Sequence, residues 1–146
     1  KDYYDFSELI REHQVLVVTI NYRLGPMGWF THPAIQGLQN GIDKTSNFGT
    51  LDIMEALKWV QSNIQNFGGD PDNITIFGES AGGNNVLSLL ASPMGNGLFH
   101  KAISQSGYTT SFTREEALGI NQKGIVVNQL GSDPVSPVLT LLDMEE

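Results

Sequence analysis

Residues 78–82 read GESAG and place a serine at the centre of a short glycine-rich stretch. The apolar residues 74–77 precede this stretch, and a helical pattern follows it. A serine hydroxyl is a weak nucleophile, and a sharp turn from strand to helix can lift it clear of the backbone toward a base. The stretch therefore predicts a nucleophile elbow with Ser80 as the nucleophile. A glycine-rich turn whose serine takes no part in chemistry is the alternative.

The neighbours of Ser80 have separate expected roles. A Cβ atom at Gly78 or Gly82 would press the strand against the helix, and the turn is expected to strain the serine backbone. The helix begins near Ala81, whose backbone N–H is the first candidate for an oxyanion-stabilising donor. Glu79 is either a carboxylate that shapes a pocket tolerant of positive charge or a solvated residue at the helix start.

A buried strand and a long helix are expected to position this turn. Residues 15–20 read VLVVTI, and such a β-branched run is typical of a strand buried on both faces. Residues 50–67 predict a helix, which Gly68 ends before a turn at residues 70–73. The apolar stripe of this helix comprises Ile53, Leu57, Val60 and Ile64, widened by Leu51 and Trp59.

The other regular segments complete an alternation of strands and helices. Residues 7–13 predict a short helix with Ser7 as its N-cap. Residues 74–77 predict a strand, residues 81–91 a helix and residues 102–106 a further strand. Strand–helix–strand units of this kind indicate an α/β fold with a parallel sheet.

Two longer stretches lie outside these predicted elements. Residues 25–46 are rich in glycine, proline, asparagine and threonine, and they predict a long surface loop. Residues 113–130 predict a helix that opens on a capping box of Thr113 and Glu116. The segment from Ser132 onward fits no element.

Composition narrows the classes of partner and cofactor. The chain has 146 residues, a formal net charge of -8 and no cysteine. The negative charge disfavours nucleic acid and anionic membrane surfaces as partners, and no apolar run has the length of a transmembrane segment. We expect no metal or organic cofactor, because Asp70, Asp72 and Asn73 lack the glycine and distal glutamate of a calcium loop. Cellular location and oligomeric state stay open.

Five stretches, in order along the chain, resemble the type-B carboxylesterase family, which includes the cholinesterases. They are VVTINYRLG at residues 17–25, NFG and LD within residues 47–52, ALKWV at 56–60, FGGDPDNITIFGESAGG at 67–83 and FHKAISQSG at 99–107. The resemblance covers roughly residues 15–131. It implies a three-layer αβα sandwich, part of an α/β-hydrolase fold, around a central and mostly parallel sheet. It also implies hydrolysis of small-molecule carboxylic esters through an acyl-enzyme on Ser80.

The resemblance assigns roles by motif position. Ser80 takes the nucleophile position, and the backbone N–H of Ala81 takes a position in the oxyanion hole. Glu79 and Ser106 match positions beside the catalytic group, as a pocket carboxylate and a supporting hydroxyl. Ile53 departs from the family, which commonly carries glutamine there.

Other parts of the family pattern match nothing in the chain. The glycine-rich oxyanion loop would precede residue 1, and the catalytic acid and histidine would follow residue 146. The chain also begins without methionine or a signal-peptide pattern. We therefore expect an internal fragment, a single partial domain over residues 1–146, which is inactive alone.

The three histidines of the chain are His13, His32 and His100. His100 precedes a strand, so it is expected at the sheet edge opposite to Ser80. His32 follows the first predicted strand at the correct edge, but it precedes the serine in the chain. His13 is expected at the surface, and a structural role is favoured for all three.

Two classes of function follow. The first is a serine esterase that acts through Ser80. The second is a non-catalytic adhesion or interaction module of the same fold. The retained Ser80 with Gly78 and Gly82 favours the esterase, because a binding module has no need of a nucleophile elbow.

Overall fold

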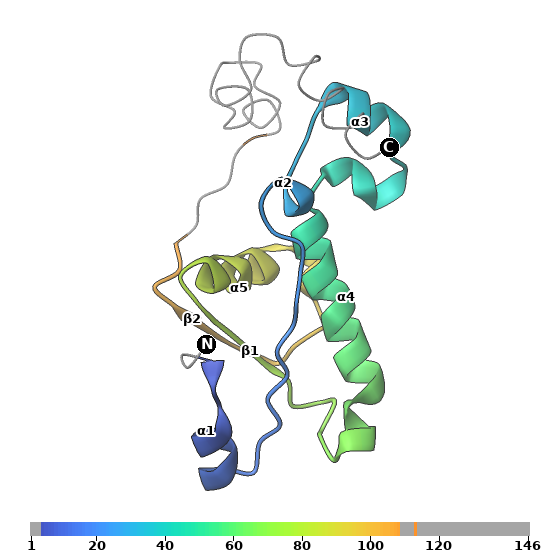
Figure 1. Ribbon diagram of the computed structural model, residues 1–146. Coiled ribbons are helices and arrows are strands. Elements are labelled where there is room, and N and C mark those ends of the chain that lie inside the picture. Colours follow the sequence, from blue (N-terminus) through green and yellow to red (C-terminus); the bar gives the residue numbers. More distant parts are fainter. Residues whose placement is uncertain (1–3, 109–112, 114–146) are drawn as a thin grey trace, which may run out of the picture. The chain divides into compact units, whose positions relative to one another are not determined.

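The computed structural model describes residues 4–108 and Thr113 (Figure 1). The chain divides into two compact units. The sheet unit consists of Lys1–Tyr22 with Thr50–Thr109, and the second unit consists of Arg23–Gly49 with Thr110–Glu146. The predicted helix at residues 113–130 falls outside the described residues, apart from Thr113.

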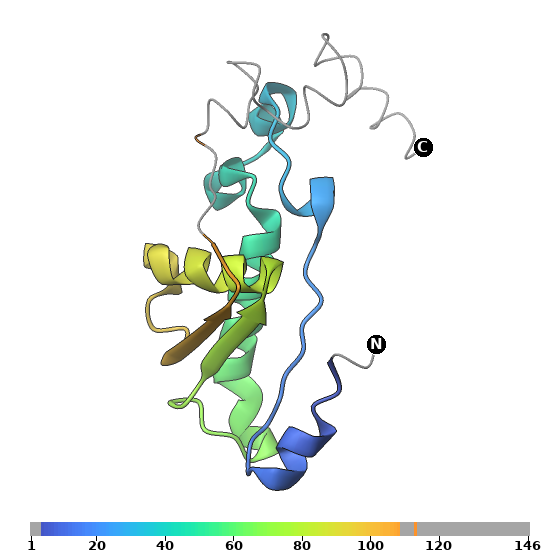
Figure 2. The same cartoon turned by 90° about the vertical axis from the view of Figure 1, so that its left-hand side faces the viewer.

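The sheet unit is built on two parallel strands, β1 (Thr75–Glu79) and β2 (Lys101–Gln105). Their register runs from Thr75 opposite Lys101 to Glu79 opposite Gln105. The connection from β1 to β2 contains α5 (Ala81–Ala91) and η4 (Pro93–Gly95), so it is a helical crossover (Figure 2). The predicted α/β class with a parallel sheet is confirmed, and residues 81–91 form the predicted helix.

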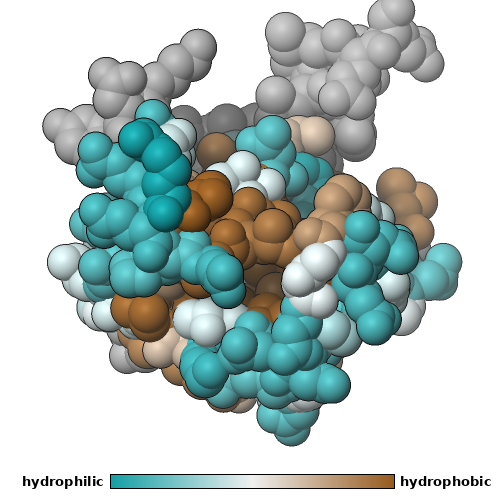
Figure 3. Space-filling model, turned by 90° about the horizontal axis from the view of Figure 1, so that it is seen from below, coloured by the Kyte–Doolittle hydropathy of each residue, from teal (hydrophilic) through white to brown (hydrophobic). Residues whose placement is uncertain are grey.

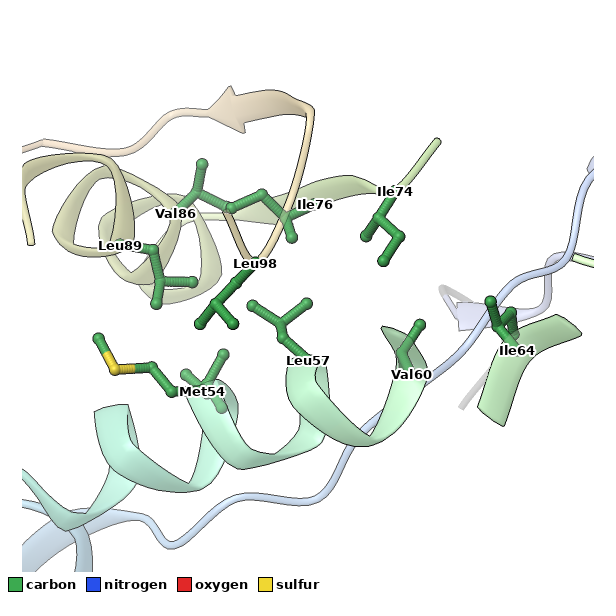
Figure 4. Packing of buried hydrophobic residues seen from close by; sticks show 10 residues of the cluster. Met54, Leu57, Val60, Ile64, Ile74, Ile76, Val86, Leu89 and Leu98 are labelled. Atoms are coloured by element: carbon green, nitrogen blue, oxygen red, sulfur yellow. The ribbon is translucent and has the colours of Figure 1, made fainter. Parts of the chain in front are cut away.

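One face of the sheet is covered by a core of apolar side chains. The long helix α4 (Phe48–Asn63) continues as η3 (Ile64–Phe67) and packs with α5 against the β1 residues on that face (Figure 4). The core comprises Ile53, Met54, Leu57, Val60, Ile64, Ile74, Ile76, Val86, Leu89 and Leu98. The described residues thus supply the sheet and one of the two helical layers that were expected.

The helical stripe of α4 is confirmed in part. Ile53, Leu57, Val60 and Ile64 are all buried, and the partly buried Leu51 packs against them. Trp59 is 52% exposed, so its assignment to the stripe is wrong. Its ring lies 6.2 Å from that of Phe67, on the outside of the helix. Gly68 ends the helical segment with a φ of 83°, in the left-handed region that favours glycine.

The predicted strand at residues 15–20 is not a strand in the structure. These residues belong to no regular element, and among residues 4–108 β1 and β2 are the strands of the sheet. Val15, Leu16 and Val18 are each more than 40% exposed, so the predicted burial on both faces is also wrong. A β-branched run forms a strand only where a neighbour offers a ladder of hydrogen bonds.

The second unit contains short helices where a long loop was predicted. They are α2 (Gly25–Gly28), α3 (Pro33–Leu38) and η2 (Gly41–Thr45). Within this unit the guanidinium of Arg23 lies 5.1 Å from the ring centre of Phe48. Each helix is one or two turns long, and no apolar period can be read from so few residues.

A short helix, α1 (Ser7–Glu12), lies near the start of the sheet unit, as predicted. Ser7 is its first residue, not its N-cap. The carboxylate of Asp5 accepts hydrogen bonds from the hydroxyl and the backbone N–H of Ser7, which lower the pKa of Asp5 below its usual value. Phe6 packs edge-on against Phe77, with 5.6 Å between ring centres.

The sheet face opposite to the core retains exposed apolar side chains. Phe77 on β1 is 46% exposed and Ile103 on β2 is 52% exposed. Apolar surface is also gathered at the centre of the molecular face in Figure 3, where hydrophilic residues surround it. None of the helices in the described part of the chain has the length and apolar character needed to cross a membrane.

The exposed apolar sheet face predicts poor solubility of the 146-residue chain. The double variant Phe77→Thr/Ile103→Thr should bind less of a hydrophobic fluorescent dye and associate less in analytical ultracentrifugation. Ile42→Thr in η2 removes an equally exposed side chain elsewhere and should change neither result. A monodisperse wild-type chain with no dye binding would contradict this prediction.

Adjacent leucines on α5 provide a test of the core. Leu89 is 3% exposed and Leu90 is 54% exposed. Leu89→Ala should lower the free energy of unfolding by about 2–4 kcal/mol, because it removes transfer energy and leaves a cavity. Leu90→Ala should lower it by less than about 0.5 kcal/mol. Urea titrations followed by circular dichroism measure the free energy of unfolding of both variants. Equal losses in the two would show that Leu89 is not a core residue.

Candidate active site

Ser80 occupies the turn between β1 and α5 in a conformation that is rare for a residue with a side chain. Its φ is 53° and its ψ is -114°. A serine at this positive φ stores about 1–3 kcal/mol of strain, which the surrounding structure must hold. The Ser80 N–H donates to the carbonyl of Gln105 at 2.9 Å, and its carbonyl accepts from the N–H of Asn84 at 3.0 Å. The predicted strained turn from strand to helix is therefore present, and Ser80 itself is exposed.

The two motif glycines differ in what surrounds them. A Cβ atom at Gly78 would lie 2.4 Å from the carbonyl carbon of Gly82 and 2.8 Å from its Cα. The expectation that a side chain at Gly78 would press strand against helix is confirmed. A Cβ atom at Gly82 would meet nothing within 4 Å, so the same expectation for Gly82 is wrong. The backbone of Gly82 makes the close contact with Gly78, and open space lies where a side chain of Gly82 would be.

A second close backbone contact involves Gly83, which the sequence reasoning missed. A Cβ atom at Gly83 would lie 2.8 Å from the carbonyl oxygen of Gln105 and 2.9 Å from the Cα of Gly107. The hydroxyl of Ser104 donates to the Gly83 carbonyl at 3.1 Å. The first turn of α5 therefore packs directly against the end of β2. The doubled glycine after Ser80 is the signal that could have pointed to this contact.

The end of β2 brings further polar groups to the same sheet edge. Ser106 follows Gln105, the register partner of Glu79, just as Ser80 follows Glu79. Ser106 has a φ of 53°, close to that of Ser80. The predicted proximity of Ser106 to the nucleophile is thus consistent with the strand register. Its role as a supporting hydroxyl stays a prediction.

Ala81 and Glu79 flank the serine on α5 and β1. Ala81 is the first residue of α5, and the N–H groups of a first helical turn have no acceptor within the helix. Such N–H groups can stabilise a negative charge beside Ser80. Glu79 ends β1 and is exposed, so its carboxylate is solvated at the same edge. The catalytic roles of both residues stay predictions.

His100 lies at the opposite end of the sheet from Ser80, as expected. It precedes β2, and its Nδ1 accepts a hydrogen bond from the N–H of Ile74 at 3.1 Å. Its own N–H donates to the Ile74 carbonyl at 2.8 Å. The strand rise of about 3.3 Å per residue puts it on the order of 15–20 Å from Ser80. His100 therefore anchors the start of both strands.

The other two histidines also have structural surroundings. His13 is the exposed C-cap of α1, in agreement with the expected surface position. His32 belongs to the second unit, where it is 7% exposed and stacks on Phe30 with 6.5 Å between ring centres.

The residues weighed as a calcium loop form a turn before β1. The carboxylate of Asp70 accepts the N–H of Asp72 at 2.9 Å, and the N–H of Asn73 donates to the Asp70 carbonyl, so Asp70 shapes this turn.

The chain resembles a family of known proteins. A model of the carboxylesterase family matches residues 1–131. The chain is similar to the para-nitrobenzyl esterase of Bacillus subtilis (strain 168), with 46% identity over 129 residues, which cover 82% of this chain and 25% of that protein. It is also similar to the cocaine esterase of Homo sapiens, with 51% identity over 104 residues, 71% of this chain and 17% of that protein.

Solved structures give the same result. A structure titled PNB esterase matches 75% of this chain and 22% of its own, with a TM-score of 0.61 and 45% identity. A structure titled thermophylic PNB esterase matches 68% of this chain and 20% of its own, with a TM-score of 0.60 and 48% identity. These similarities confirm the α/β-hydrolase fold class. The chain spans 25% or less of the length of these relatives.

Two adjacent glycines allow a test of the packing around Ser80. Gly83→Ala should lower the free energy of unfolding by about 1–3 kcal/mol, because its Cβ would overlap backbone atoms of β2 and the following turn. Gly82→Ala meets no neighbour and should raise it by about 0.5–1 kcal/mol through the higher helix propensity of alanine. Denaturant titrations measure both changes, and equal effects of the two substitutions would contradict the packing.

Proposed function

The chain belongs to the carboxylesterase family, and on that premise we propose that it carries the nucleophile of a serine carboxylic-ester hydrolase, Ser80. The observation that supports this most strongly is the strained and exposed Ser80 at the turn from β1 to α5. Strain of this kind persists only where surrounding contacts hold it, and it gathers at functional sites. The tight contact of Gly78 with Gly82 and the hydrogen bond from Ser80 to Gln105 are such contacts.

The proposed reaction proceeds through an acyl-enzyme. The Ser80 Oγ attacks the ester carbonyl carbon while a base takes the hydroxyl proton, and the carbonyl oxygen becomes an oxyanion. The backbone N–H of Ala81, at the start of α5, donates to that oxyanion. Collapse of the tetrahedral intermediate breaks the bond to the alcohol, which leaves with the proton. Water then attacks the acyl group and restores Ser80.

The base and its partner acid are proposed to come from beyond these 146 residues. His100 is held by Ile74 at the far end of the strands, and His13 caps α1. His32 is buried beside Phe30 in the second unit. The relatives are more than three times as long as this chain, since 82% of it covers 25% of one and 71% of it covers 17% of the other. The proposal therefore includes negligible turnover by the 146-residue chain alone.

Two neighbours are proposed to support the reaction. The Glu79 carboxylate is one residue from Ser80 and exposed, so it would favour an ester with positive charge in its alcohol or acyl part. The Ser106 hydroxyl, at the same sheet edge, would donate to a group that orients the base. Small-molecule esters are the proposed substrates, and the net charge of -8 gives no support for nucleic acid.

A non-catalytic module of the same fold is the second candidate. It is favoured by one observation, that no histidine of the sheet unit lies at the Ser80 end of the strands among residues 4–108. This candidate gives no catalytic role to the strained and exposed Ser80.

Hydrolysis of p-nitrophenyl butyrate by the complete natural protein that contains residues 1–146 tests the proposal. Ser80→Ala should lower kcat by at least about 10³-fold, because it removes the attacking oxygen. Ser62→Ala, at an exposed serine of α4, should leave kcat unchanged and serves as the control. Full activity of Ser80→Ala would overturn the esterase proposal, and an inactive wild-type protein would favour the non-catalytic module.

The 146-residue chain gives a second measurement in the same assay. We expect no turnover above that of its own Ser80→Ala variant. Turnover that depends on Ser80 in the bare chain would show that a base lies within it, and that part of the proposal would then fail.

A further inference from the structure

The first turn of α5 is fastened to the turn that follows β2, residues 106–108. The N–H of Ser80 reaches the Gln105 carbonyl at 2.9 Å, and the backbones of Gly83 and Gly107 approach so closely that a Cβ atom on either would overlap the other. These contacts join backbone to backbone. One side chain adds to them from the helix, that of Asn84.

Asn84 is bonded in two directions. Its backbone N–H donates to the Ser80 carbonyl at 3.0 Å, which closes the first turn of α5. Its side-chain Oδ1 accepts the backbone N–H of Tyr108 at 2.7 Å. A single residue thus links the strained serine with the residue that ends the turn after β2. The link is independent of the β1–β2 hydrogen bonds, because Tyr108 lies beyond the register pair of Glu79 and Gln105.

We propose that Asn84 is a positioning residue, whose carboxamide oxygen fixes residues 106–108 beside Ser80 in the geometry that the nucleophile needs. This inference rests on the proposed esterase function. Asn84 does not touch the reacting atoms. Its side chain acts through the turn that carries Ser106 and Gly107. Its bond to the Ser80 carbonyl comes from the backbone N–H, which a substitution by leucine or aspartate keeps.

The strain at Ser80 gives this link its importance. Ser80 and Ser106 both have a φ of 53°, so two neighbouring strands end in uncommon backbone conformations at one edge of the sheet. Each conformation persists only if its surroundings hold it. If the bond from Tyr108 to Asn84 is lost, the turn at residues 106–108 loses its side-chain hydrogen bond to α5, while its backbone contacts with Gly83 remain. Small displacements of a catalytic group can lower a rate by as much as about 100-fold.

The next residue along α5 provides a matched control. Asn85 has the same side chain, but its Nδ2 donates to the hydroxyl of Tyr22 at 3.1 Å, away from the turn after β2. Tyr22 packs against the core, so this bond joins α5 to the segment that precedes residue 23. Asn85→Leu should therefore affect stability without loosening residues 106–108, and Asn84→Leu should loosen them. Leucine favours a helix at either position.

Hydrogen exchange on the complete natural protein tests the link directly. In the peptide that contains Tyr108, the slowest amide should exchange about tenfold faster in Asn84→Leu than in the wild type, which corresponds to loss of one hydrogen bond. Asn84→Asp keeps the acceptor oxygen and should restore the wild-type rate. Asn85→Leu should not change it. Equal exchange in the wild type and Asn84→Leu would overturn the inference.

Kinetics on the same four proteins test the effect on the nucleophile. With p-nitrophenyl butyrate, Asn84→Leu should lower kcat about tenfold with KM changed by less than about twofold. Asn84→Asp should recover most of kcat, and Asn85→Leu should keep kcat even if its Tm falls. A loss of kcat in Asn84→Leu no larger than in Asn85→Leu would overturn the positioning role. Full activity of Ser80→Ala would instead overturn the esterase proposal, and the exchange result alone would then decide the link.

Discussion

The backbone of Ser80 is the constraint on which the sheet unit depends. A residue with a side chain takes a φ of 53° only under constraint, and the structure holds it from three directions. β1 and α5 approach so closely that Gly78 cannot carry a Cβ atom. β2 accepts the N–H of Ser80 through Gln105, and Asn84 closes the first turn of α5 onto the Ser80 carbonyl. The parallel pairing of β1 with β2 matters because it brings Gln105 to that end of the sheet.

The apolar core supports this arrangement of β1 and α5. α4 and α5 pack on one face of the two strands, and the buried residues between them keep α5 pressed against β1. The start of the strands is fixed in a similar way, since His100 exchanges hydrogen bonds with Ile74. The other sheet face keeps Phe77 and Ile103 exposed. A small sheet with exposed apolar side chains on its outer face fits a segment that spans only 25% or less of its relatives.

Local sequence patterns predicted the features that depend on local contacts. The period of α4, the bounds of α5 and the elbow at Ser80 each follow from neighbours within a few residues. Residues 15–20 show the limit, because a β-branched run becomes a strand only when a partner strand lies beside it. The doubled glycine at residues 82 and 83 indicates a close contact, but the sequence does not show which of the two makes it with β2. Which of two adjacent glycines faces a neighbour depends on how β2 approaches α5, and that approach is set by residues more than 20 positions away in the chain. The bond from Tyr108 to Asn84 is hidden for the same reason.

Covalent labelling shows whether the strained Ser80 is a reactive nucleophile. The complete natural protein would be treated with a fluorophosphonate, digested and analysed by mass spectrometry to locate the phosphonylated residue. We expect one stoichiometric label on Ser80, which prior acylation by a slowly hydrolysed ester prevents. A label on another residue, or none on a protein that hydrolyses esters, would contradict this expectation.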